Sequence, residues 1–377
     1  MMKVYKVVGV GIADTQNKKG SNFLVLLYIF CVIFFLCIWI LVQDPYIRKL
    51  NYLLLMLYIF VYLLVIGKIR KSVLLPATLI VPVLFVAYFY SEPSSYLANN
   101  FLLLLLGLMP FFISIKFSDR NIYWLALFIS LIGFLDVYRR MGYIQLSSIS
   151  ILYSSSFTES NIALCSGGFV LYFIARKKWK MFILSLLVSV LFFKRIVILA
   201  IVVTILIYLI LFRLRIMESR KIRFALVFLS FVAGMVVAVN YDRIVGPISV
   251  KLGLSDNILT MGRTIWWSAI KSELYSSHTL ELFFGHGIGS AADFMNKNFR
   301  VEHPHSDYFR ILFDIGVMGS VLLFTCLSAV LSRTMYGSLI ALYLAVIMLT
   351  DNIIVYTGYL WVFAAFVNVQ NEKRTVI

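Results

Sequence analysis

The side chains best suited to proton transfer are concentrated in one part of this chain. All four histidines, His278, His286, His303 and His305, lie between residues 278 and 305. An imidazole has an ordinary pKa close to neutrality, which suits a general acid or base. This stretch belongs to the one long polar interruption, about 241–307, of an otherwise apolar sequence. We therefore expect chemistry in this segment, at the surface of a membrane.

The composition indicates an integral membrane protein. Hydrophobic residues make up 62% of the 377 residues and charged residues only 14%, whereas soluble domains carry about 25% charged residues. A transmembrane β-barrel would alternate polar and apolar residues along each strand. The apolar runs here are continuous, for example residues 23–42, so the pattern favours helices that cross the membrane.

Apolar runs near the length that a helix needs to cross a bilayer recur along the whole chain. We expect about 12 such helices, in a single polytopic all-α domain that covers residues 1–377. The predicted spans lie near 23–43, 51–67, 73–90, 101–116, 121–137, 161–175, 178–194, 196–212, 223–240, 308–331, 335–350 and 353–370.

The positions of Lys and Arg orient these spans. Basic residues cluster in alternate loops, near 68–71, 116–120, 176–180, 213–223 and 333. Because cytoplasmic loops carry an excess of Lys and Arg, both termini are predicted to face the cytoplasm. Two loops, about 138–160 and 241–307, then face outward. The net charge of +17 is thus explained by topology, and we expect no nucleic-acid partner.

Two cations interrupt the apolar stretch 181–212, which is too long for one span. Basic loops that should both lie inside flank this stretch, so the chain must turn at Lys194 and Arg195 on the outer side. One interpretation is a tight turn whose two cations extend to the interface. The other is a cationic site at the outer membrane face. The second is favoured because no acidic residue lies nearby in the sequence.

The residues around His305 predict a neutral imidazole. Pro304 suits the first position of a helix, so we expect the next span to begin at about 304 with His305 in its first turn. The positive end of the helix dipole disfavours imidazolium there, and a neutral ring can accept a proton. His303 is either the N-cap of this helix or a partner of His305. Asp307, Arg310 and Asp314 have the spacing of a structural ion-pair ladder.

A guanidinium near the membrane surface suggests an anionic ligand. Arg263 lies close to Trp266 and Trp267, and paired tryptophans are typical of the membrane interface. Arg263 is either an ordinary interfacial cation or a ligand of phosphate oxygens, which a guanidinium binds in a bidentate manner. Arg195 would add a second cation to such a phosphate site.

Other chemistries fit the same segment less well. A metal site built from His303 and His305 with His286, Asp293 or Glu302 matches no known ligand spacing, so we expect no metal and no cofactor. The run from Gly285 to Gly289 lacks the strand and glycine spacing of a dinucleotide loop. Its glycines are expected to allow a tight turn. We predict that His278 and His286 are ordinary loop residues, and that the four cysteines are small hydrophobic residues.

Four motifs occur in an order that resembles the O-antigen polymerase and ligase family. They are Arg263 to Trp267, Gly285 to Gly289, His305 to Phe309, and Gly316 to Gly319. Upstream, Asn161 matches an Asn that often precedes a span in the family, and Arg195 matches an Arg at the tip of a helical hairpin. Two positions depart from the pattern: Ser306 stands where many members carry Asn, and Lys194 where they carry Ser. These departures leave the subfamily and the acceptor open.

The resemblance implies a GT-C-like fold and a metal-independent glycosyltransferase in the bacterial inner membrane. At the periplasmic face, His305 would act as the base, and Arg195 and Arg263 would bind the diphosphate of an undecaprenyl-diphosphate-linked oligosaccharide. The supporting residues would be Lys194, Asn161, His303, Asp307 and Tyr308. The implied partners are the lipid-linked donor and acceptor, membrane lipids and a chain-length co-polymerase.

The leading functional hypothesis is polymerisation of lipid-linked repeat units of O-antigen or a related surface polysaccharide. The alternative within the family is an O-antigen ligase, which transfers the glycan to lipid A core. The alternative from another class is a flippase of the lipid-linked glycan. Transporters usually contain repeats and polar sites at the membrane midplane, whereas here the polar residues gather outside the spans.

Overall fold

The structure is a computed structural model that describes residues 5–42, 44–66, 78, 81–82, 84–89, 91, 96–113, 115–141, 160–192, 194–213, 216–253, 255–256, 260 and 262–369. Every regular element in these ranges is a helix, and the described part contains no strand beyond one isolated bridge between Phe117 and Val369. The predicted all-α class is therefore confirmed.

Four helices are long and apolar enough to cross a membrane: α1 (Tyr5–Leu41), α6 (Asp119–Met141), α10 (Arg220–Val239) and α16 (Asp307–Leu331). Shorter apolar helices accompany them, namely α3 (Tyr52–Val65), α5 (Leu97–Phe112), α7 (Ile162–Ala175), α8 (Trp179–Leu191), α9 (Arg195–Arg213), α17 (Met335–Ile347) and α18 (Thr357–Val367). Each of these helices overlaps one of the predicted apolar runs. About half of the predicted run 73–90 is described, with residues 84–89 helical, and most of the predicted outward loop 138–160 lies outside the described residues.

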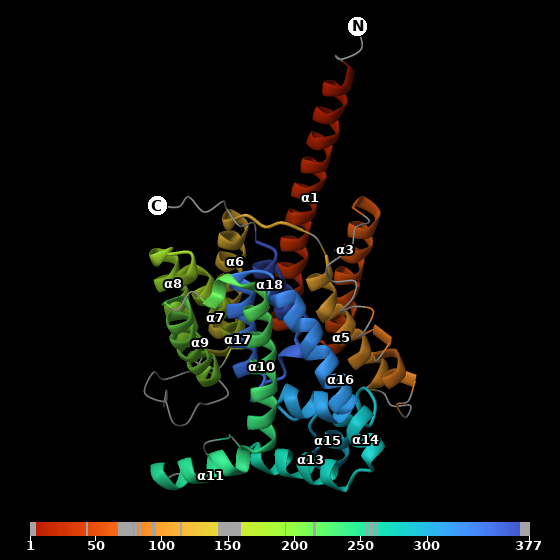
Figure 1. Ribbon diagram of the computed structural model, residues 1–377, viewed down its shortest axis with the longest axis vertical. Coiled ribbons are helices and arrows are strands. Elements are labelled where there is room, and N and C mark those ends of the chain that lie inside the picture. The colour runs from red at the N-terminus through yellow and green to blue at the C-terminus, as the bar shows by residue number, and fades with distance from the viewer. Residues whose placement is uncertain are drawn as a thin grey trace.

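The centre of the bundle is formed by α7, α17 and α18 (Figure 1). Helix α18 is buried along its whole length. Close approach depends on small residues: a Cβ at Gly168 would lie 3.0 Å from the ring of Phe363. Because lipid is as apolar as a leucine side chain, helices in a membrane associate through such close packing. The same reason explains why many large apolar side chains on the outer helices are exposed.

The polar segment 241–307 forms short helices gathered at one end of the bundle (Figure 1). They are α11 (Tyr241–Leu252), α13 (Thr264–Ser276), α14 (Thr279–Phe284) and α15 (Ser290–Phe299). The most apolar helices lie in the body of the bundle and this segment does not enter it. The arrangement agrees with a polar region outside the membrane-spanning part.

The glycine-rich turn at 285–289 packs against a break in α16. It is the tight turn that the sequence predicted. Gly316 has a φ of 64°, which interrupts the helical backbone. The freed carbonyl oxygens of Phe313 and Asp314 accept hydrogen bonds from the backbone N–H groups of His286 (2.8 Å) and Gly287 (3.0 Å). The backbones of Gly285 and Gly316 pack so closely that neither position has room for a Cβ.

This packing makes Gly316→Ala a test of the break in α16. A Cβ at Gly316 would lie 2.5 Å from the carbonyl oxygen of Phe283. Gly253 has the same φ of 64° with a ψ of 27° and no atom within 4 Å of an added Cβ, so Gly253→Ala is the control for a left-handed backbone without close packing. The ψ of −171° at Gly316 adds a backbone cost of its own. Gly253→Ala should cost about 1–2 kcal/mol for its left-handed backbone, and Gly316→Ala clearly more. Thermal unfolding in detergent would measure both, and equal losses would contradict the packing argument.

Candidate functional site

The loop between α17 and α18 brings together charged residues from distant parts of the chain. The ammonium group of Lys194, at the α8–α9 corner, forms an ion pair with the carboxylate of Asp351 in this loop. It also donates a hydrogen bond to Oδ1 of Asn161, the N-cap of α7, at 2.8 Å. Lys194 is 7% exposed and Asp351 2% exposed. The counter-acid that is missing near Lys194 in the sequence is therefore supplied by Asp351.

Arg263 reaches the same loop from the polar segment. It is the N-cap residue of α13, and its Nη1 donates a hydrogen bond to the carbonyl oxygen of Thr350. One loop thus carries acceptors for two cations that are far apart in sequence. The two sequence motifs that contain Lys194 and Arg263 meet in space.

His305 lies beside these cations. Its ring stacks on Trp266 of α13, with 5.5 Å between ring centroids and 24° between planes. The pKa of His305 is lowered to about 4. Burial is the main cause; the nearby guanidinium of Arg263 and the ammonium of Lys194 act in the same direction, and Asp351 opposes them. The ring is therefore neutral at neutral pH, as a proton acceptor must be.

The expected cause of this neutral state was wrong. Helix α16 begins at Asp307 with Ser306 as its N-cap, so neither Pro304 nor His305 belongs to its first turn and His303 is not the cap. His305 instead adopts a left-handed backbone with a φ of 52° just before the helix. Burial and neighbouring cations, rather than the helix dipole, depress its pKa.

Tertiary hydrogen bonds hold the histidine turn in this conformation. On one side, Nε1 of Trp267 donates to the carbonyl oxygen of Pro304 at 2.9 Å. On the other side, the backbone N–H of Asp307 donates to the carbonyl oxygens of Met348 (3.0 Å) and Asp351 (3.1 Å). The turn is fixed between α13 and the α17–α18 loop, so His305 and Asp351 are positioned by the same contacts.

Asp307 and Tyr308 connect the start of α16 to α17 and to the loop that follows it. Oδ2 of Asp307 accepts a hydrogen bond from the backbone N–H of Ile354 at 3.0 Å, which fastens the loop that carries Asp351. The hydroxyl of Tyr308 donates to the carbonyl oxygen of Ala345 in α17 at 2.9 Å. Neither contact was foreseen from the sequence.

The predicted ion-pair ladder forms only in part. Arg310 and Asp314 pair across one helical turn at 3.6 Å, and Nη2 of Arg310 also donates to Oδ1 of Asn100 in α5 at 2.8 Å. Asp307 instead binds the backbone of Ile354. Oδ1 of Asp314 accepts from the backbone N–H of Ala291 at 2.8 Å, so this residue connects α16 with α15.

Of the remaining residues considered in the sequence analysis, Arg195 and His303 lie near His305 and Lys194, and His278 and His286 lie elsewhere in the polar segment. Arg195 is the first residue of α9, half-buried at the same corner as Lys194. His303 lies behind His305, where burial lowers its pKa to about 3 and the guanidinium of Arg310 acts in the same direction. His286 packs on Phe313 with 4.4 Å between ring centroids, and His278 is the N-cap of α14. The last two are structural loop residues, as predicted.

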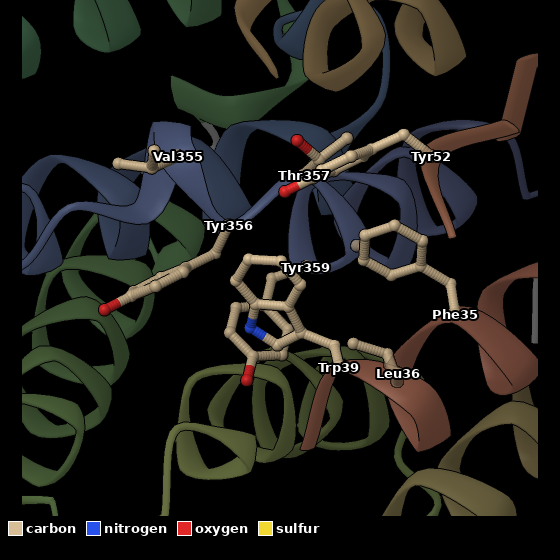
Figure 2. Close-up of a pocket in the computed structure, with 9 residues that line it drawn as sticks. Phe35, Leu36, Trp39, Tyr52, Val355, Tyr356, Thr357 and Tyr359 are labelled. Atoms are coloured by element: carbon tan, nitrogen blue, oxygen red, sulfur yellow. The ribbon is translucent and has the colours of Figure 1, made fainter. Parts of the chain in front are cut away.

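Asp351 and Tyr356 are the residues of this site that the sequence analysis missed. The side chain of Tyr356 lies near that of Asn161 and also borders an aromatic cleft with Trp39 and Tyr359 (Figure 2). The sequence did contain one signal for Asp351. A lysine buried at one outer turn needs an acid from another outer turn, and the polar pair Asp351-Asn352 separates the last two apolar runs.

Comparisons with known proteins add no identification. No protein-family model matches this chain, and no match was found among curated proteins. In the described part of the chain, no three His, Cys, Asp or Glu side chains gather as they would around a metal ion. The distinctive feature of this end of the bundle is the arrangement of His305, Arg263, Lys194 and Asp351.

The buried pair can be tested with a double-mutant cycle on stability. Lys194→Met and Asp351→Leu should each cost about 3–5 kcal/mol, because each leaves one buried charge without its partner. The double variant should recover much of this loss, since two apolar side chains leave no charge behind.

The control pair for this cycle is Lys271 and Asp242, whose side chains are joined at 2.9 Å at the surface. Lys271→Met should cost no more than about 1 kcal/mol. Thermal unfolding in detergent would measure all variants. Additive losses in the Lys194 and Asp351 double variant would show that the two charges do not depend on each other.

Proposed function

We propose that this chain is a glycosyltransferase that polymerises lipid-linked oligosaccharide repeat units at the periplasmic face of the bacterial inner membrane. The observation that carries the proposal is a neutral imidazole, His305, held beside the cations Arg263 and Lys194 at one end of an apolar helical bundle. A proton acceptor next to fixed positive charge suits the transfer of a sugar from a diphosphate leaving group.

In the proposed reaction, His305 removes the proton from a hydroxyl group of the acceptor glycan. The oxygen of that hydroxyl attacks the anomeric carbon of the donor sugar, which is linked to undecaprenyl diphosphate. The bond between the anomeric carbon and the diphosphate oxygen breaks, and the diphosphate leaves with the electron pair. Because His305 is neutral at neutral pH, it is in the correct form to start this sequence.

The cations would stabilise the leaving diphosphate. Arg263 is anchored at the N-terminus of α13 by its hydrogen bond to Thr350, and a guanidinium matches the geometry of phosphate oxygens. Arg195 would add a second guanidinium from the α8–α9 corner. Lys194 is paired with Asp351, and its contacts with Asp351 and Asn161 hold that corner in place. A site fixed before the substrate arrives loses little free energy to reorganisation.

Several features of the chain favour a lipid-linked substrate. The candidate site lies where the polar helices meet the end of the apolar bundle (Figure 1). Trp266, which stacks on His305, is of the residue type enriched at membrane interfaces. The resemblance of the four motifs to the O-antigen polymerase and ligase family favours the same class, and also a chain-length co-polymerase as partner.

The role of His305 can be tested with purified protein in liposomes and synthetic diphosphate-linked repeat units. The parent protein should produce a ladder of longer glycans, and His305→Ala should lower the rate by about 10²–10⁴-fold. His278→Ala, which removes an exposed imidazole of the same segment, should leave the rate unchanged. An unaltered ladder from His305→Ala would refute the base. Consumption of core lipid instead of a lipid-linked repeat would identify a ligase.

The role of Arg263 can be tested by Arg263→Lys, which keeps the charge but removes the bidentate geometry. We expect a lower rate of chain extension and weaker inhibition by inorganic pyrophosphate. Arg243→Lys is the matched control, because Arg243 is exposed on the neighbouring helix α11. Full activity and unchanged inhibition in Arg263→Lys would argue against guanidinium binding to the diphosphate.

A further inference from the structure

Helix α11 (Tyr241–Leu252) leaves the bundle where a candidate membrane span ends. Helix α10 ends at Val239, and α11 begins two residues later at Tyr241. Figure 1 shows α11 lying across the end of α10 and extending away from the other helices. If α10 crosses the bilayer, α11 starts at the level where the apolar interior gives way to lipid headgroups.

The first turn of α11 is fastened to α13. The hydroxyl of Tyr241 forms a hydrogen bond with Oγ of Ser268 at 2.6 Å, and its ring is buried against Trp267. The ammonium of Lys271 binds the carboxylate of Asp242 at 2.9 Å. These contacts set the direction of α11, while the rest of the helix projects beyond them.

The projecting part of α11 has an apolar stripe. Ile244, Val245 and Ile248 share one face of the helix, since residues three and four apart lie one above the other. Ile244 is 39% exposed and Ile248 45% exposed. The exposed Lys251, seven residues after Ile244, lies at the far end of the same face, and the exposed Arg243 lies on another side of the helix. Apolar residues along one face with cations beside them are typical of helices that lie in a membrane surface.

We infer that α11 is an interfacial helix that binds the lipid surface next to the end of α10. Ile244 and Ile248 enter the boundary between headgroups and acyl chains beside Val245, which packs against the bundle, and Lys251 extends toward lipid phosphate groups. A lipid surface fits better than a protein partner, because α11 begins two residues after the end of a candidate membrane span and carries cations beside its apolar stripe. This inference goes beyond the proposed function and does not depend on it.

The depth of α11 in the membrane surface would affect the position of the candidate site. Because α11 is joined to α13 through Tyr241 and Asp242, its depth in the membrane surface sets the depth of α13. Arg263 caps α13, and Trp266 of α13 covers His305. Binding of α11 to lipid would therefore hold both residues at headgroup level.

Spin labels on two faces of α11 test this inference in the full-length protein in lipid nanodiscs. Ile248→Cys places a label on the apolar stripe. Val250→Cys is the matched control, because Val250 is also aliphatic, is 81% exposed and lies about 200° further around the helix. The label at 248 should collide more often with oxygen than with a water-soluble nickel chelate, at a depth of about 5–10 Å. The label at 250 should show the opposite preference.

A second labelled variant and the labelled parent protein serve as controls for the spin-label experiment. Ile244→Cys should reproduce the result at 248, so that one misfolded variant does not decide the matter. The unsubstituted protein, labelled in parallel, corrects for its own cysteines, of which Cys31, Cys165 and Cys326 are buried and Cys37 is half-buried. Equal exposure to the nickel chelate at 244, 248 and 250 would overturn the inference.

The role of Lys251 can be tested by measuring the depth of the label at 248 with and without anionic lipid. Addition of an anionic phospholipid to the nanodiscs should move the label at 248 deeper, because Lys251 is attracted to the added negative charge. Lys251→Gln should reduce this shift. A shift of the same size in Lys251→Gln would show that Lys251 does not bind the headgroups.

Discussion

The ammonium of Lys194 and the carboxylate of Asp351 are buried together at one end of an apolar bundle. A single buried charge in such surroundings is costly, and it is tolerated only with a partner. The α8–α9 corner must therefore meet the α17–α18 loop. The same loop accepts hydrogen bonds from Arg263 and from the backbone of Asp307, so the positions of Arg263 and His305 depend on this ion pair.

The charges around His305 connect the two proposed tasks of the site, which are proton acceptance and diphosphate binding. Burial and the neighbouring cations Arg263 and Lys194 keep His305 neutral, and the guanidinium groups of Arg263 and Arg195 would attract a diphosphate. An anion bound near them would offset their charge and raise the proton affinity of the imidazole. In the proposed reaction, binding of the donor would thus make His305 a stronger base at the moment when a proton must be taken.

Local sequence rules failed where tertiary contacts were stronger. Pro304 predicts a helix start at about 304, but the helix begins at Asp307. Trp267 binds the carbonyl of Pro304, and the loop at 348–351 binds the backbone of Asp307. Together these bonds hold His305 in a left-handed turn that local propensity does not predict. By contrast, the glycines of 285–289 form the expected tight turn, because left-handed backbone at these positions is a local property.

The helical membrane character, the approximate helix positions and the polar segment that contains His305 and Arg263 can all be derived from the order of the amino acids. Hydrophobic length and loop charge suffice for these features, because each depends on residues close together in the chain. The pairing of Lys194 with Asp351 and the stacking of Trp266 on His305 appear only in the folded bundle. Such pairs are set by how helices pack, and neither hydropathy nor spacing in one sequence specifies which distant charges will meet.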